Sequence, residues 1–292
     1  MLTVIEILKL SEEYLAKHGV PDARRNAELL ASHVLGKSRL DLYLEHERPL
    51  DDEEVRNMRA ALAQRKDRKP IQYIFGEAEF YGLPFEVDPS VLVPRPETEL
   101  LVEESLRALK ETRVGKAVVY EVGTGSGCIS VSVAKNFDNC RIYASDISTE
   151  ALKIASGNAA KNDVSEKIEF LLGHDLKPFR DAGAPQADLV VSNPPYVPTA
   201  ELQNLEPEVR DYEPTIALDG GPDGLDVIKR FIDQAPGTMS VGGTLLLEIG
   251  IGQSRAVTDY INSSGCFDEP GIVKDYQDID RIVIVKLKKQ AV

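Results

Sequence analysis

The sequence has no tryptophan and only three cysteines in 292 residues, and basic side chains are scarce relative to acidic ones. Cys128, Cys140 and Cys266 are odd in number and far apart, so a disulfide framework of the kind that holds small secreted domains is not expected. No stretch reaches the roughly 18 apolar residues that a membrane helix needs, and residues 1–20 lack the apolar centre of an export signal. We therefore expect a cytoplasmic protein without a membrane partner.

Residue types that commonly bind metals are also few. The four histidines (His18, His33, His46 and His174) are scattered without metal-ligand spacing, so no metal site is expected. Cys128 falls at a predicted helix start, where a thiol can become nucleophilic. We interpret it as a small packing residue beneath a loop.

The charge balance is acidic, with 34 Lys and Arg against 48 Asp and Glu and a formal net charge of −14. Residues 1–70 hold equal numbers of the two signs, so the rest of the chain carries the whole excess. A protein that grips nucleic acid generally needs a basic face to neutralise phosphates, which argues against a nucleic-acid substrate. One basic cluster is either a solvated helix end or a local binding patch: Arg65, Lys66, Arg68 and Lys69.

Three patterns follow one another along the chain. Residues 1–73 place apolar side chains at helical spacing and predict a small helical domain. Residues 74–95 predict a hairpin linker with its turn at Gly82–Leu83–Pro84. Residues 96–292 alternate helix and strand, which is typical of a doubly wound, mostly parallel α/β sheet. Its predicted elements are a helix at 97–111 and strands at 118–122, 141–145, 167–172, 187–192, 243–249, around Val273 and at 282–287, the last two as an antiparallel edge pair.

A glycine-rich loop follows the first predicted strand of this sheet. Glu121 and Val122 lead into Gly123, Thr124, Gly125, Ser126 and Gly127, after which a helix begins. Glycines let the backbone approach a ligand closely, and free N–H groups at a helix start favour polar ligand atoms. A dinucleotide fingerprint needs glycine at its first, third and sixth positions, whereas here the glycines stand first, third and fifth. The loop therefore predicts a ligand site but weakens the pyrophosphate interpretation.

Acidic residues end the neighbouring predicted strands. Asp146 lies 19 residues beyond Gly127, where a carboxylate can accept both hydroxyls of a ribose. The alternative is that Asp146 caps the helix beginning near Thr149. The next strand delivers Asp175 and Leu176 to the same edge, where they can accept from an adenine amino group and cover its ring.

The tetrapeptide Asn193–Pro194–Pro195–Tyr196 follows a buried strand and suits a planar NH2 group. The lone pair of such a nitrogen is delocalised, so a catalyst must accept hydrogen bonds from its N–H protons to localise that pair. The Asn193 side-chain oxygen and the Pro194 carbonyl offer two acceptors, held where prolines restrict the backbone. Tyr196 offers a flat ring for stacking. The alternative interpretation is a rigid turn after the strand.

The glycine loop, Asp146 and the tetrapeptide, on successive strands, resemble class I S-adenosylmethionine-dependent methyltransferases that modify amino nitrogens. Further stretches are similar to the peptide chain release factor glutamine methyltransferase family, the HemK/PrmC type. They are PIQYIFG at 70–76, FYG at 80–82, VPRPETE at 93–99, Glu213–Pro214, ALDGG at 217–221, DGLD at 223–226 and LEIG at 247–250. The resemblance spans nearly the whole chain.

This resemblance implies methylation of the side-chain amide nitrogen of the glutamine in the Gly-Gly-Gln motif of release factors, with S-adenosylmethionine as cofactor. It implies that residues 123–127 contact the methionine part of the cofactor and Asp146 its ribose. Asp175 and Leu176 would contact adenine, although some relatives carry an aromatic residue in place of Leu176. Glu121 is then a partner for the methionine amino group or a simple strand-end carboxylate.

The remaining parts of the chain complete these expectations. Asn193 belongs to both the cofactor and the substrate site, with Pro194, Pro195 and Tyr196 on the substrate. Residues 1–73 become a recognition domain for the release factor, and we expect a monomer. Direct methyl transfer is expected, with no covalent enzyme intermediate. The 197–224 loop is a substrate gate or a surface connection.

Two other functions stay open on the sequence alone. An amino methyltransferase acting on adenine or guanine of nucleic acid shares the tetrapeptide, and a binding module with a vestigial cofactor fold would keep the architecture. The acidic charge and the lack of an obvious added nucleic-acid domain favour a protein substrate. The intact glycine loop and tetrapeptide argue against a vestigial site.

Overall fold

A computed structural model describes residues 1–111 and 115–288. Within those ranges no helix is long and apolar enough to cross a membrane. The chain forms two compact units: one joins Met1–Gly76 to the short segment Glu206–Tyr212, and the other comprises Glu77–Leu205 and Glu213–Val292. The expected α/β class with an N-terminal helical region is confirmed, while the functional division into recognition and catalytic domains stays a prediction.

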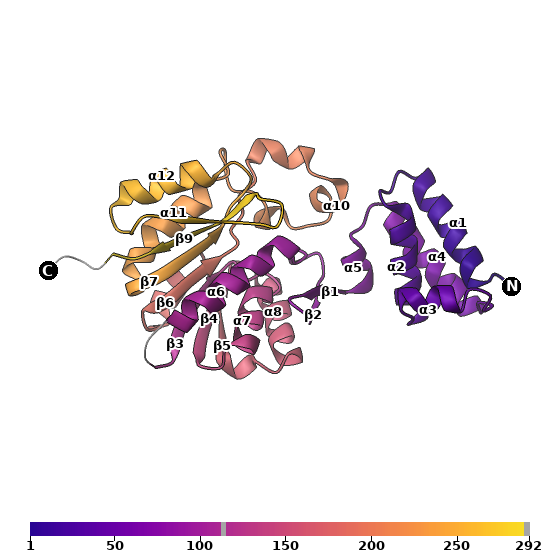
Figure 1. The fold of residues 1–292 in the computed structure, drawn as a ribbon, viewed down its shortest axis with the longest axis horizontal. Helices are drawn as coiled ribbons and strands as arrows, with labels where there is room; N and C mark the ends of the chain where they lie inside the picture. The colour runs from indigo at the N-terminus through magenta and orange to yellow at the C-terminus, as the bar shows by residue number, and fades with distance from the viewer. Residues whose placement is uncertain (112–114, 289–292) are drawn as a thin grey trace. The chain divides into compact units, whose positions relative to one another are not determined.

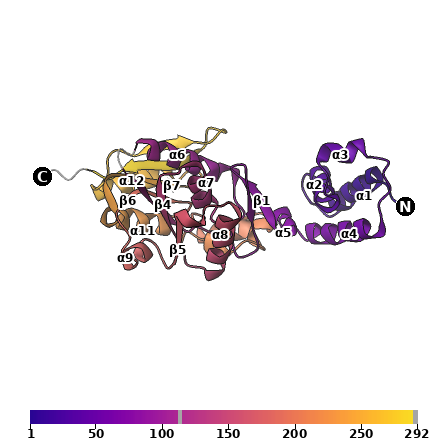
Figure 2. The ribbon, with the colours of Figure 1, turned by 90° about the horizontal axis from the view of Figure 1, so that it is seen from below.

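The first unit contains a bundle of helices (Figures 1 and 2), namely α1 (Val4–Lys17), α2 (Ala23–Leu35), α3 (Arg39–Leu44), α4 (Asp52–Lys66) and α5 (Ile71–Phe75). Capping boxes begin α1, α3 and α4, where Thr3, Ser38 and Asp51 accept from backbone N–H groups of the first turn. The apolar stripes that the spacing predicts are buried together. The largest fully buried members of this core are Leu15, Leu30, Leu42 and Met58.

The segment Glu206–Tyr212, with the short helix α10 (Pro207–Arg210), belongs to this unit through a charge cluster. Arg65 Nη2 and Arg68 Nη2 each donate to a carboxylate oxygen of Glu208 over 2.6 Å, and Arg65 is buried. The Tyr212 hydroxyl donates to the carbonyl of Asp67, also over 2.6 Å. The interpretation of the basic cluster as a solvated helix end is therefore wrong for Arg65 and Arg68. Their partner, Glu208, lies 143 and 140 residues away in sequence, so no local sequence pattern could predict the pairing.

The second unit is built on a sheet whose seven described strands follow the order β5-β4-β3-β6-β7-β9-β8. Strands β3 to β7 pair in parallel, and β9 runs antiparallel to both β7 and β8. This order confirms a doubly wound, mostly parallel sheet with an antiparallel edge pair. The bounds are β3 (Ala117–Val122), β4 (Cys140–Asp146), β5 (Ile168–Leu172), β6 (Ala187–Ser192), β7 (Met239–Glu248), β8 (Gly271–Lys274) and β9 (Asp280–Lys286).

Helices cover both faces of this sheet. Side chains alternate between the two faces of a strand, and in β3 Val119 joins one apolar cluster while Tyr120 joins the other. The Val119 cluster includes side chains of α6 (Glu99–Glu111), α7 (Cys128–Asn136) and α8 (Thr149–Lys161). The Tyr120 cluster includes those of α9 (Lys177–Asp181), α11 (Asp226–Gln234) and α12 (Ser254–Ser264). Figure 1 shows α11 and α12 side by side, separate from α6 and α7.

The hairpin belongs to the second unit and pairs β1 (Glu77–Phe80) with β2 (Leu83–Glu86). Its turn lies at Tyr81–Gly82, where φ is positive at both residues (51° and 70°), as a tight hairpin turn requires. The predicted turn at Gly82–Leu83–Pro84 is wrong because Leu83 and Pro84 pair with the opposite strand. A proline is tolerated there, since both strands of a two-stranded ribbon are edges.

Short 3₁₀ helices connect several of these strands and helices. The helix predicted from Glu97 begins as a 3₁₀ turn, and α6 follows it only at Glu99, whereas β7 starts at Met239, before its predicted bound. The turns are η1 (Pro96–Thr98), η2 (Ser165–Lys167), η3 (Thr199–Asn204), η4 (Thr215–Ala217) and η5 (Ala235–Gly237).

Candidate active site

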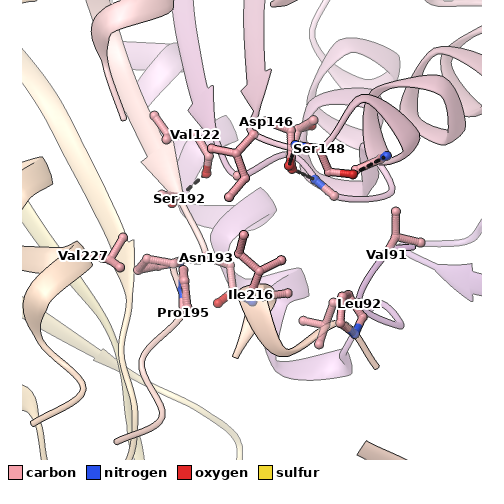
Figure 3. A pocket seen from close by; sticks show the side chains of 18 of the residues that line it. Val91, Leu92, Val122, Asp146, Ser148, Ser192, Asn193, Pro195, Ile216 and Val227 are labelled. Carbon is pink, nitrogen blue, oxygen red and sulfur yellow. Dashed lines mark hydrogen bonds between the residues drawn. The ribbon is translucent and has the colours of Figure 1, made fainter. Parts of the chain in front are cut away.

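A cavity of about 440 Å³ lies at the carboxyl ends of β3, β4, β5 and β6 (Figure 3). In open α/β sheets this edge is the usual ligand site. Residues 123–126 of the glycine loop and residues 146–148, 173–175 and 192–195 line it, together with residues between Ser90 and Thr98 and between Pro214 and Gly221. Figure 3 shows Asp146, Asn193 and Ile216 around the same space, although they come from three separate parts of the chain. The structure thus brings most of the predicted site residues together.

The glycine loop lies along the cavity with a tightly folded backbone. Gly123 and Gly125 have positive φ (71° and 53°) and line the cavity together with Thr124 and Ser126. The N–H groups of Gly123 and Thr124 donate to the carbonyl of Ser145 near the end of β4, over 2.9 and 3.0 Å. The loop is therefore held to the neighbouring strand.

Gly127 is not among the residues that line the cavity. Its φ is 79°, and a Cβ at this position would lie 3.1 Å from the Cβ of Ala155 in α8. The structure therefore gives Gly127 a role in the close packing of α7 against α8, and does not bring it to the expected ligand contact.

Glu121 is a buried carboxylate that lines the cavity, with 1% of its surface exposed. Its Oε2 accepts from Thr124 Oγ1 over 2.7 Å and from both the backbone and the hydroxyl of Ser130. Its Oε1 has no hydrogen-bond partner among the described residues. Burial raises the pKa of Glu121 to about 7. A buried acceptor left open at a cavity wall favours a ligand that brings an N–H donor or a positive charge.

Asp146 braces the loops around the end of β4. Its Oδ2 accepts from the N–H of Gly125 over 2.8 Å, and its Oδ1 accepts from that of Ser148 over 3.0 Å (Figure 3). The capping residue of α8 is Ser148, whose Oγ accepts from the N–H of Ala151 over 3.1 Å. The helix-cap interpretation of Asp146 is therefore wrong. Each of its oxygens has a further lone pair to offer at the cavity wall.

Asp175 lines the cavity, whereas Leu176 does not. Asp175 has a φ of 54° and accepts from Arg230 Nε over 3.3 Å and from Gln234 Nε2 over 3.4 Å. Leu176 is fully buried in the apolar cluster that includes α9 and α11, so its side chain is not placed to cover a ligand ring. Ile147, which sequence reasoning missed, lines the cavity and is partly exposed. Its position directly after the acidic residue that ends β4 is the signal that could have found it.

The tetrapeptide reaches the cavity at three of its four residues. Asn193, Pro194 and Pro195 line the cavity, and Tyr196 does not. The Tyr196 ring packs against the apolar cluster of the α11 face, its hydroxyl donates to Glu248 Oε1 over 3.4 Å, and burial raises its pKa. The residues that carry the two predicted acceptors therefore line the cavity, while the cavity wall does not include the predicted stacking ring.

The chain leaves the tetrapeptide and later returns to it. Val197 N–H donates to the carbonyl of Leu218, and Gly220 N–H donates to that of Val197, both over 2.9 Å. A Cβ at Gly220 would lie 2.8 Å from the carbonyl oxygen of Pro195, so the returning chain packs closely against the tetrapeptide. A gating movement of this loop stays a prediction. The returning part supplies cavity wall at Pro214, Ile216 and Ala217.

Arg95, a second residue that sequence reasoning missed, lines the cavity and is paired with Glu213. Its Nη2 lies 2.7 Å from both carboxylate oxygens. Burial raises the pKa of Glu213, and the guanidinium opposes that rise. Both residues fall within stretches that resemble the family, but no spacing rule links two positions 118 residues apart.

Cys128 also lines the cavity, and it is buried. Burial raises the pKa of its thiol to about 12. Because the thiolate is the reactive form, this geometry supports the interpretation of Cys128 as a packing residue. In residues 1–111 and 115–288, no group of three or more His, Cys, Asp and Glu side chains is arranged to hold a metal ion.

Comparison with known proteins gives two matching family models and several relatives of high similarity. Residues 6–76 match the model of the PrmC N-terminal domain, and residues 101–206 match that of ribosomal protein L11 methyltransferase (PrmA). A release factor glutamine methyltransferase from Geobacter sulfurreducens is 41% identical over 281 residues, covering 96% of this chain and 95% of that protein. Another, from Bacillus subtilis, is 37% identical over 291 residues, covering 99% of each.

The fold has relatives among solved structures as well. A methyltransferase from Pyrococcus furiosus is 18% identical, with a TM-score of 0.50 over 80% of this chain and 99% of that one, a likeness of fold alone. Sequence identity close to two fifths over nearly the full length of both proteins is far more specific. The chain is a methyltransferase, and it belongs to the release factor glutamine methyltransferase family.

Proposed function

We propose that this chain transfers a methyl group from S-adenosylmethionine to the side-chain amide nitrogen of the glutamine in the Gly-Gly-Gln motif of peptide chain release factors. The observation that carries the proposal is that Asn193 and Pro194 line the same cavity as Glu121, Asp146 and the glycine loop. Two acceptors suited to a planar NH2 group thus share one space with groups suited to an amino acid and a ribose. The names of the relatives at 41% and 37% identity agree with this assignment.

The cavity residues fit S-adenosylmethionine at each of its polar parts. The open Oε1 of Glu121 is an acceptor for its ammonium group, and residues 123–126 would contact its methionine chain. Asp146 would hold the ribose hydroxyls, Asp175 would accept from the adenine amino group, and Ile147 would pack on the ring. When bound, this cofactor supplies a methyl group on a positively charged sulfur. A donor at Glu121 would also remove the cost of a buried acceptor without a partner.

Asn193 and Pro194 act on the substrate nitrogen in this proposal. An amide nitrogen is a poor nucleophile because its lone pair is delocalised into the adjacent carbonyl. The side-chain oxygen of Asn193 and the carbonyl of Pro194 accept from its two N–H protons and direct the lone pair toward the methyl donor. As the nitrogen forms its new bond it gains positive charge, which both acceptors stabilise. One of its protons then leaves to water, and no covalent bond to the enzyme is required.

Residues 1–73 would recognise the folded release factor. Every residue to which we assign a chemical role lies after Pro94, and the cavity is of a size for a cofactor and a side chain rather than for a folded protein. The match of residues 6–76 to a PrmC N-terminal domain supports a domain particular to this family. Such a domain distributes affinity over a larger area than one glutamine side chain offers.

Transfer of a labelled methyl group from S-adenosylmethionine tests the proposal. The full chain is given three acceptors separately: an intact release factor, the same factor with the motif glutamine replaced by alanine, and an RNA pool. We expect label in the intact factor alone. Label in the RNA pool and none in the factor would instead assign the chain to the methylation of adenine or guanine in nucleic acid.

A further inference from the structure

A buried chain of hydrogen bonds ends at Asn193. Its Nδ2 donates to Thr98 Oγ1 over 3.0 Å, and Thr98 Oγ1 donates to Glu248 Oε2 over 2.8 Å. The other oxygen of Glu248 accepts from the Tyr196 hydroxyl over 3.4 Å. Thr98 and Glu248 are each 2% exposed, so water does not compete for these groups. Three elements distant in sequence therefore meet at one polar network: η1, the end of β7 and the tetrapeptide.

The direction of this chain follows from the chemistry of its ends. An ionised carboxylate has no proton to donate, so Glu248 accepts from both hydroxyls that face it. The Thr98 proton is then directed to Glu248, which leaves Thr98 Oγ1 an acceptor toward Asn193. Only the NH2 half of the Asn193 amide satisfies that acceptor. The oxygen half is consequently left to face a different partner.

We propose that Thr98 and Glu248 are positioning residues, which fix the Asn193 side chain with its oxygen presented to the substrate nitrogen. The inference rests on the proposed function, in which that oxygen accepts from the glutamine NH2 group. The two halves of an asparagine amide are nearly the same in shape, so packing alone discriminates poorly between them. A reversed amide would point an NH2 group at the substrate NH2 group, and two donors cannot bond. The hydrogen-bond chain supplies the discrimination that packing lacks.

The ionisation of Glu248 controls the direction of the chain. Burial raises its pKa to about 7, while the hydroxyl of Thr98 and the charge of Arg281 oppose that rise. A protonated Glu248 could donate to Thr98, and Thr98 could then donate to the oxygen of Asn193, which reverses the amide. The titratable or charged groups that act electrostatically around this carboxyl are Glu97 in η1, Cys128 in α7, Tyr196 in the tetrapeptide and Arg281 in β9.

The matched pair Thr98→Val and Thr98→Ser tests the inference in the full chain with a release factor as substrate. Valine keeps the shape of threonine but removes the hydroxyl, whereas serine keeps the hydroxyl. We expect Thr98→Val to lower kcat by about tenfold to a hundredfold while the calorimetric Kd for S-adenosylmethionine stays near that of the parent. The Tm should fall, because Glu248 Oε2 and the Asn193 NH2 group each lose a buried partner. Thr98→Ser should recover most of the lost kcat. A folded Thr98→Val protein with the parent kcat would overturn the inference.

Glu248→Gln provides a second, independent readout. The carboxamide of glutamine has nearly the volume of the carboxylate, but only its oxygen can accept a hydrogen bond, so it cannot accept from both Thr98 and Tyr196. It also does not gain a proton near neutral pH. The parent kcat should fall as pH drops through about 7, where Glu248 gains a proton, and the variant should have a low kcat without that fall. If Thr98→Val does not fold at the assay temperature, this profile decides. An unchanged kcat and pH profile in Glu248→Gln would count against positioning.

Asn193→Ala separates this inference from the function on which it rests. If Asn193→Ala keeps its turnover, the assignment of Asn193 to the substrate fails, whatever Thr98 does. If Asn193→Ala loses turnover and Thr98→Val does not, only the positioning role fails. Adding Thr98→Val to Asn193→Ala should cause no further loss of kcat, because the two act on the same interaction. Independent, multiplying losses would contradict an action through Asn193.

Discussion

Asn193 is the residue whose loss should affect chemistry most and cofactor binding least. Replacement by alanine removes one of two preorganised acceptors, so we expect kcat to fall on the order of a hundredfold or more. The Kd for S-adenosylmethionine, measured by calorimetry, should stay close to that of the parent. Asp146→Ala offers the matched comparison, because that carboxylate lines the cavity and braces Gly125 and Ser148. It should weaken cofactor binding before it slows single-turnover transfer, and the reverse pattern in the two variants would contradict both assignments.

Glu121 should make the stability of the cofactor-free protein depend on pH. Its folded pKa of about 7 lies above the ordinary value of 4.5, so between those values the native state holds a proton that the unfolded state has lost. Stability should therefore fall as pH rises through that window, by up to about 1.4 kcal/mol per pH unit for one group. Glu121→Gln should show a shallower decline in the free energy of unfolding, measured by denaturant titration from pH 4.5 to 7. Equal slopes in the parent and the variant would refute this contribution.

Some residues of the site can be located at the cavity from the sequence alone, and others cannot. Strand ends and their acidic residues are fixed by topology, so Glu121, Asp146 and Asp175 could be expected at one edge. Leu176 and Tyr196 could not, because burial in an apolar cluster depends on what packs over them, and α11 is more than 25 positions further along the chain than either. The link from Asn193 to Thr98 spans 95 residues and follows no sequence period.

At the scale of elements, the contact between the returning loop and the tetrapeptide should be sensitive to a single methyl group. A Cβ at Gly220 would lie 2.6 Å from the carbonyl oxygen of Gly224 and 2.8 Å from that of Pro195, both backbone atoms that cannot easily move. We expect Gly220→Ala to displace the tetrapeptide and reduce turnover by at least about tenfold. Turnover is to be measured at saturating cofactor and release factor.

Gly157→Ala is the control for that variant. Gly157 lies within α8 and is not among the glycines with positive φ. Apart from its chain neighbours and the adjacent backbone of α8, no atom lies within 4 Å of the point that a Cβ would occupy. Alanine there should leave turnover unchanged and raise stability by about 0.5–1 kcal/mol, because glycine disfavours helix interiors. If both glycine variants lost turnover equally, close packing against the tetrapeptide would not be the cause.

Local sequence patterns predict whether a segment is a helix or a strand, but they do not predict the residues at which it begins and ends. The alternating strand and helix signals give the parallel sheet because consecutive parallel strands need a crossover helix. The hairpin turn was misplaced since Pro84 looks like a turn residue, yet in an edge strand its missing N–H costs nothing. The start of α6 was predicted too early because Pro96 to Thr98 form a 3₁₀ turn. Over three residues, the spacing of apolar side chains in a 3₁₀ turn cannot be distinguished from that in an α-helix.

At the scale of the whole molecule, deletion of residues 1–73 should separate recognition from chemistry. We expect the remaining chain to bind S-adenosylmethionine and to methylate a short glutamine peptide poorly but measurably. Its preference for an intact release factor over the peptide, measured as a ratio of kcat/KM values, should be lost. A remnant that kept the full preference would show that these residues do not recognise the factor, and an insoluble remnant would favour a structural role.

The deletion has a second effect for which a control is needed. It removes Arg65 and Arg68, which pair with Glu208 in the segment Glu206–Tyr212. Glu208→Ala in the full chain breaks the same ion pairs but keeps the helical domain. This variant should retain the preference for the intact factor. If it lost the preference as fully as the deletion does, the position of that segment, and not recognition by residues 1–73, would explain the result.

One nitrogen of a release factor should be methylated through the acceptors of the tetrapeptide. Mass spectrometry of a release factor incubated with the chain and S-adenosylmethionine measures this directly, because fragment masses locate the added methyl group. We expect a single methyl group on the side-chain nitrogen of the Gly-Gly-Gln glutamine, formed by the parent chain and nearly absent with Asn193→Ala. A methyl group found reproducibly at another residue, or formed at the glutamine equally well by Asn193→Ala, would contradict it.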